Sequence, residues 1–281
     1  MSYLDHIREC NAHDLDGFVP FVAVGRQVGW VRPGLAGRLA AFRDAFRVSS
    51  DSVALSPELR TYGERSRALD RVLRRLADEG LVEGWRGEAY SVAPIAGGEP
   101  LFEMERAACP LFGVRSFGLQ VNGLVRRRGE LHMWIARRSR SKPTFPGMLD
   151  VFVAGGIPAG VAPMENLLKE AEEEAGVPPE IARQAIPAGV VSYCMEVPEG
   201  LKPDVQFVFD LELPADFVPR NRDGEVESFR LEPIERVMRT VRQTREFKFN
   251  CNLVIIDFLV RHGLIGPDEP DYLEIALGLR R

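Results

Sequence analysis

The segment from Gly155 to Val177, GGIPAGVAPMENLLKEAEEEAGV, reads as a glycine-rich loop followed by an acidic helix. Pro163 suits the first helical turn and Gly176 suits a left-handed stop, so the sequence marks both ends of the helix. Three glutamates share one helix face at i, i+3 and i+4: Glu170, Glu173 and Glu174. Like charges at this spacing cost about 0.2–0.5 kcal/mol per pair, and acids near the negative end of the helix dipole add to that cost. We therefore expect a positive partner for this face.

The same helix carries an apolar stripe that can pack on a sheet while the acids point away from it: Met164, Leu167, Leu168, Ala171 and Ala175. Three carboxylates on a docked helix suit a hard divalent cation that also holds phosphate, Mg²⁺ or Mn²⁺. Gly155 and Gly156 have no Cβ, so their backbone N–H groups can approach a phosphate closely. A solvated acidic face is the alternative reading, and the glycine-rich loop disfavours it.

This segment resembles the signature of the Nudix hydrolases, which reads G, five residues, E, seven residues, then R-E-U-x-E-E-x-G-U with U aliphatic. Gly155 falls at the first glycine, and three acids fall at the later glutamate positions: Glu170, Glu173 and Glu174. Val161 replaces the first glutamate and Lys169 replaces the arginine, two positions that brace the loop and helix in the family. The later glutamates bind metal there. The resemblance therefore implies a Mg²⁺-dependent hydrolase acting on a small-molecule diphosphate.

A narrower resemblance runs along most of the chain. Four segments are similar to the Nudix subgroup related to the thiamine pyrophosphokinase fusion proteins: 85–92, 145–160, 223–229 and 247–263. It implies an α/β fold, with a smaller α+β domain of unassigned role in residues 1–114 and a Nudix α/β/α sandwich with a mixed sheet in residues 115–281. The implied substrate is thiamine diphosphate or its oxidised derivatives, cleaved to the monophosphate and phosphate.

Further candidate residues flank the acidic helix. Glu225, and with less support Glu227, stand where many Nudix proteins place an extra acid that binds metal or activates water; a surface strand acid is the alternative. A basic run precedes the loop: Arg137, Arg138, Arg140 and Lys142. Arg138 and Lys142 are the candidates to bind phosphate through charge-assisted hydrogen bonds, against a solvated strand end. We expect Tyr90 to belong to the N-terminal core rather than to a stacking platform.

Composition indicates a soluble protein of two domains. The chain has 281 residues, 45% of them hydrophobic, and a formal charge of −5, which disfavours a general nucleic-acid binder. The four cysteines are isolated, so neither a zinc site nor a disulfide framework is signalled. The N-terminal sequence MSYLDHIREC has no apolar signal core, and no apolar stretch is long enough to span a membrane. We expect a cytoplasmic protein, and its oligomeric state stays open.

The periodicity predicts the following elements. In the first domain we expect two strands at 18–24 and 28–31, helices near 35–46 and at 65–79, and a hairpin of 81–85 with 88–92, before a boundary within 94–114. In the second domain we expect strands and helices in the order 118–125, 131–137, 150–154, the acidic helix, 188–198, 205–213, 225–233, then helices at 234–245 and 249–262.

Two other functions remain open at this stage. The basic helix and hairpin of residues 65–92 resemble the recognition helix and wing of a winged helix, which would suit a DNA-binding regulator. The acidic charge of the whole chain disfavours that reading. A Nudix enzyme acting on a nucleoside diphosphate derivative is the third possibility.

Overall fold

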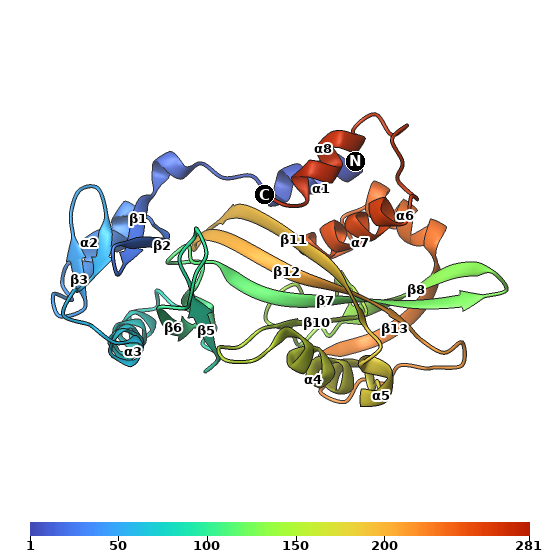
Figure 1. The fold of residues 1–281 in the computed structure, drawn as a ribbon, viewed down its shortest axis with the longest axis horizontal. Helices are drawn as coiled ribbons and strands as arrows, with labels where there is room; N and C mark the ends of the chain where they lie inside the picture. The colour runs from blue at the N-terminus through green and yellow to red at the C-terminus, as the bar shows by residue number, and fades with distance from the viewer.

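A computed structural model describes the whole chain, residues 1–281. Figure 1 shows a large twisted sheet with helices on both of its faces, and a smaller N-terminal part beside one end of that sheet. The large sheet has seven strands in the order β11-β12-β7-β8-β13, with β10 paired to β7 and β9 paired to β8. The predicted α/β/α sandwich, preceded by a smaller α+β part, is confirmed.

The large sheet is mixed because β12 runs parallel to β7 while its other pairings are antiparallel. Its strands have these bounds: β7 Ser116–Arg127, β8 Glu130–Arg138, β9 Leu149–Asp150, β10 Val153–Gly156, β11 Ile186–Val197, β12 Gly200–Glu212 and β13 Val226–Pro233. The strands predicted for this half of the chain are present within about five residues, except that the strand predicted at 150–154 is broken into β9 and β10, which pair with different neighbours. Side chains alternate between the two faces, so each long strand contributes to both layers.

Two helical layers cover this sheet. One face is covered by α4 (Pro163–Ala175) and α5 (Pro179–Ala182), with Leu119 and Val121 of β7 in the shared core. The other face is covered by α6 (Ile234–Gln243) and α7 (Phe249–Arg261). Nearly every residue of α7 is buried; α1 (Tyr3–Cys10) packs against α7, and α8 (Tyr272–Gly278) packs against α1 (Figure 1).

The N-terminal part has its own four-stranded sheet, ordered β2-β1-β4-β3, and a separate two-stranded sheet. Its elements are β1 Val19–Ala23, β2 Arg26–Val31, α2 Pro33–Leu39, β3 Phe46–Val48, β4 Val53–Leu55, α3 Tyr62–Asp78, β5 Ala89–Val92 and β6 Phe102–Glu105, with 3₁₀ turns η1 Leu15–Gly17 and η2 Arg106–Ala108. Phe21 and Phe112 lie in a core distinct from those of the large sheet.

Two local predictions for this part are wrong. The hairpin of 81–85 with 88–92 does not form, since β5 pairs with β6 instead. Three glycines with positive φ break the chain before β5: Gly80, Gly84 and Gly87. The helix near 35–46 ends at Leu39, because Phe46 is buried in a strand pair opposite Leu55.

The N-terminal helix α1 also departs from the expected division of the chain. Tyr3, Leu4 and Ile7 lie in the same core as α7, so the first residues pack with the C-terminal helices. The domain boundary between residues 114 and 115 stays a prediction. The four cysteines are free thiols, and no helix combines the length and apolar character needed to cross a bilayer.

The acidic helix begins and ends where the sequence predicts. Pro163 occupies its first turn, and Gly176 follows its last residue with φ 63°. A Cβ on Gly176 would lie 2.9 Å from the carbonyl oxygen of Arg220, so both the backbone conformation and the close approach favour glycine.

We expect Gly176→Ala to destabilise the protein more than Gly25→Ala. Gly25 has a similar φ of 68° but open space around it, so alanine there costs only the left-handed penalty of about 1 kcal/mol. Alanine at Gly176 must also displace the backbone near Arg220. Urea denaturation of both variants measures the difference. Equal losses would contradict the close contact.

Candidate active site

The Glu174 carboxylate is buried between the acidic helix and the sheet. Glu174 is only 8% exposed, and its Oε2 accepts a hydrogen bond of 2.9 Å from the N–H of Ala154 in β10. The prediction that all three acids point away from the sheet is wrong for Glu174, because it follows buried Leu167 by seven residues and shares its face. Burial raises the pKa of Glu174 well above its usual value, and the nearby Glu170 and Glu225 carboxylates add to this.

Glu170 lies against the glycine loop. A Cβ on Gly155 would be 2.8 Å from Oε1 of Glu170, so the glycine leaves the space that this side chain occupies. Burial raises the pKa of Glu170, although Lys169 opposes the shift with its ammonium 3.4 Å from Oε1. Lys169 also pairs with the half-exposed Glu173 at 3.1 Å. The expected positive partner is therefore Lys169 of the same helix, and it serves mainly the outer carboxylates.

A loop before β13 brings Glu225 to the helix. Three donors of residues 220–222 satisfy the last carbonyl groups of α4: Arg220 N to Ala175 O at 2.9 Å, Arg222 N to Glu173 O at 3.0 Å and Asn221 Nδ2 to Glu174 O at 3.2 Å. Asp223 accepts a hydrogen bond of 2.8 Å from the N–H of Glu225. The sequence analysis gave residues 220–222 no role, although the run NRDG is typical of a turn.

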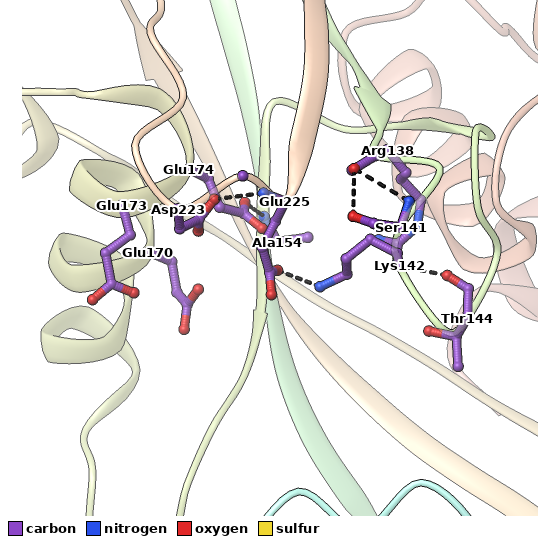
Figure 2. A network of polar contacts seen from close by, with 12 residues as sticks. Arg138, Ser141, Lys142, Thr144, Ala154, Glu170, Glu173, Glu174, Asp223 and Glu225 are labelled. Carbon is purple, nitrogen blue, oxygen red and sulfur yellow. Dashed lines mark hydrogen bonds and ion pairs between the residues drawn. The ribbon is translucent and has the colours of Figure 1, made fainter.

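Basic residues form the opposite side of the site. Figure 2 shows the glutamates of α4 on one side, Lys142 and Arg138 on the other, and Glu225 between them. Lys142 makes an ion pair with Glu225. The guanidinium of Arg138 donates to Asp150 at 2.8 Å and to the carbonyl oxygens of Thr144 and Phe145, so its donors hold the loop rather than face the site. Burial alone would raise the pKa of Asp150, but Lys248 and Arg138 hold it below its usual range.

The two loop glycines differ in the direction of their backbone groups. Gly155 is paired with Leu119, and the N–H of Ile157 donates to the carbonyl oxygen of Phe117. The backbone N–H and C=O groups of every second residue, starting from Val153, therefore point toward β7. Ala154 and Gly156 face away from β7, and the carbonyl of Gly156 accepts 2.8 Å from Asn166 Nδ2. The N–H of Gly156 is therefore the donor turned toward the site, whereas Gly155 serves the sheet and Glu170.

The donor chemistry of this site fits a hard cation. No three acidic, histidine or cysteine side chains converge in ligand geometry. However, burial raises the pKa of both Glu170 and Glu174, with Glu225 adding like charge to each, and Lys169 offsets only part of this at Glu170. The ligand atoms that the site offers are carboxylate oxygens, which Mg²⁺ prefers.

The structure brings together four of the residues predicted from sequence: Glu170, Glu174, Glu225 and Lys142. Gly156 adjoins them through Asn166 and the end of β10. Three others lie at the margin or in bracing contacts: Glu173, Arg138 and Gly155. Glu227 pairs at 3.6 Å with the exposed Arg140. The catalytic and binding roles of all these residues stay predictions.

We expect Glu174→Gln to raise the melting temperature of the metal-free protein at about pH 8 and to change it little at about pH 4. The pKa of Glu174 is higher in the folded than in the unfolded chain, so the wild type loses stability as pH rises between those values. Glutamine does not ionise, and it can still accept from Ala154. Calorimetry in EDTA measures the shift, with Glu172→Gln, an exposed acid paired with Arg222, as control. A less stable Glu174→Gln at the higher pH would contradict the inference.

The chain is similar to known proteins along almost its whole length. Residues 2–116 match a family model described as a domain of unknown function, DUF4743, and residues 117–252 match the NUDIX domain. Nudix hydrolase 24, chloroplastic, of Arabidopsis thaliana is 45% identical over 283 residues, which cover 99% of this chain and 78% of that protein. Nudix hydrolase 20, chloroplastic, of the same plant is 43% identical over 290 residues with the same coverage.

Among solved structures, the NUDIX domain of Shewanella oneidensis NrtR complexed with ADP ribose covers 54% of this chain and 90% of its own, with 15% identity and a TM-score of 0.43. The identity to the two plant proteins over 99% of the chain decides the family. This chain belongs to the Nudix hydrolase family and is a hydrolase of phosphorus-containing acid anhydrides.

Proposed function

We propose that the protein hydrolyses a diphosphate linkage with the help of Mg²⁺, and that its substrate is thiamine diphosphate or an oxidised derivative, cleaved to the monophosphate and phosphate. One observation carries the first part: the buried Glu174 and the partly buried Glu170 lie beside Glu225, and burial raises the pKa of both although Lys169 lowers that of Glu170. The resemblance of four segments to the thiamine pyrophosphokinase-related subgroup supports the second part. A match through both domains transfers substrate class better than the signature helix alone.

Each residue has a role that follows from its position. Glu170, Glu174 and Glu225 would hold the Mg²⁺, or Mn²⁺, which supplies charge neutralisation for the diphosphate and acidifies a water. The N–H of Gly156 donates to a phosphate oxygen. Glu225 is 44% exposed as a side chain and can take the proton of the attacking water. Its partner Lys142 then meets the phosphate instead of the carboxylate.

The DNA-binding alternative has no observation in its favour. Three arginines of α3 are already paired with acids: Arg71 with Asp44, Arg74 with Asp70 and Arg75 with Glu79. Arg65 is buried and bonds the backbone carbonyls of Leu59, Arg60 and Leu101. The helix therefore offers less free positive charge than its sequence suggests.

A panel of substrates tests the proposed chemistry. With Mg²⁺ present, phosphate release from thiamine diphosphate and its oxo and oxy forms should give a higher kcat/KM than hydrolysis of dGTP, ADP-ribose or NADH. A neutral oxidised ring is less costly to desolvate than the thiazolium cation, so oxidised forms should be cleaved at least as well. A preference of about tenfold for ADP-ribose or a nucleotide, some 1.4 kcal/mol in transition-state binding, would overturn the thiamine assignment and leave the hydrolase mechanism standing.

Glu170→Gln and Glu174→Gln should each lower kcat by about 10²-fold or more, because each removes a negative charge that would hold the cation. Excess EDTA should abolish turnover of the wild type. Glu172→Gln is the matched control, since this acid of the same helix faces Arg222 and not the site. Steady-state kinetics with the best substrate of the panel measures the effect. Turnover that persists in EDTA, or in the double glutamine variant, would refute the role of the cluster.

A further inference from the structure

The N-terminal domain lies directly on the signature loop. The N–H of Ala159 donates to the carbonyl oxygen of Ala89 in β5 at 2.8 Å, which joins the loop to the first strand of the two-stranded sheet. Figure 1 shows β5 and β6 next to the segment that leads into α4. This contact places the domain of unknown function beside the candidate active site.

Tyr90 reaches from this domain to Gly156. Its ring belongs to the N-terminal core, as predicted, and the residue is 5% exposed. A Cβ on Gly156 would lie only 1.6 Å from the Tyr90 hydroxyl oxygen, so the glycine is required for the tyrosine to fit. Burial of the side chain raises the pKa of this hydroxyl. The O–H of Tyr90 therefore lies at the residue whose own N–H faces the site.

Arg106 also lies beside Gly156. Its guanidinium carbon is 3.3 Å from the position of a Gly156 Cβ and 5.5 Å from the centre of the Tyr90 ring. One nitrogen, Nη1, donates to Glu88 at 2.7 Å, and the other donors have no acceptor within the protein. Burial works against the charge of Arg106, but Tyr90, Glu88 and Glu170 outweigh it and raise its pKa. The Arg106 side chain is 45% exposed, so its guanidinium is accessible beside Gly156.

We propose that Arg106 and Tyr90 form a phosphate-binding side of the active site that the N-terminal domain supplies. The free donors of the Arg106 guanidinium bind non-bridging oxygens of the diphosphate, and the Tyr90 hydroxyl and Gly156 N–H donate to the same group. Glu170, Glu174 and Glu225 act on it from the other side. A planar fork with several donors suits phosphate oxygens, and the pair with Glu88 occupies only one of its nitrogens. This inference rests on the proposed diphosphate chemistry but not on the identity of the organic group.

Direct binding of methylenediphosphonate, a diphosphate that cannot be hydrolysed, tests the proposal. Calorimetric titration of the full chain in Mg²⁺ should show binding weakened about tenfold or more in Arg106→Gln, the range of one charge-assisted hydrogen bond. Tyr90→Phe keeps the ring but removes the O–H, and it should also weaken binding by about tenfold, because the acceptor is an anionic phosphonate oxygen. Arg106→Lys should recover part of the loss. Arg75→Gln, an exposed arginine paired with Glu79, is the matched control.

Glu88→Gln separates phosphate binding from a purely structural ion pair. If Arg106 only braces the domain interface, Glu88→Gln breaks the same pair and should weaken ligand binding as Arg106→Gln does. If Arg106 binds phosphate, removing its competing acid should leave affinity unchanged or raise it. Equal weakening in both variants, or unchanged binding in Arg106→Gln, would overturn the inference. If the wild-type protein does not bind methylenediphosphonate, the diphosphate site itself is refuted. A different preferred substrate in the hydrolysis panel would leave the role of Arg106 intact.

Discussion

The hydrogen bond from the Ala154 N–H to the buried Glu174 carboxylate is the contact on which the rest of the site depends. The pairing of β10 with β7 turns the N–H of Ala154 away from that strand, and this bond then fixes where the Glu174 carboxylate lies. Burying a carboxyl is unfavourable, so the apolar contacts of α4 must hold the helix against the sheet. Burial and the neighbouring carboxylates therefore disfavour ionisation of Glu174.

The charges of α4 are divided by face. On the outer side, Glu173 pairs with Lys169 and Glu172 pairs with Arg222, so these acids are neutralised within the protein. On the inner side, Glu170 and Glu174 have raised pKa values because burial and like charge outweigh what Lys169 contributes. The loop that caps the helix adds Glu225 to this inner group. The outer face of α4 therefore carries ion pairs, and its inner face carries the carboxylates of the candidate active site.

The glycines of the signature loop serve the tertiary structure as well as the ligand. Gly155 leaves room for Glu170 of the following helix, and Gly156 leaves room for Tyr90 of the preceding domain. The two domains consequently meet at the residue where strand β10 ends. The N-terminal part, which has a core of its own, therefore contacts the end of β10 through Tyr90.

The sequence by itself determined the limits of α4, the strands of the large sheet and the cluster of acids, because Pro163, Gly176 and regular periodicity act locally. It did not determine that Glu174 is buried, that Arg138 is committed to Asp150, or that β5 pairs with β6. Those outcomes depend on partners distant in sequence, whose packing overrides local pattern. Tyr90 and Gly156 are 66 residues apart (156 − 90), and only the tertiary structure brings them together.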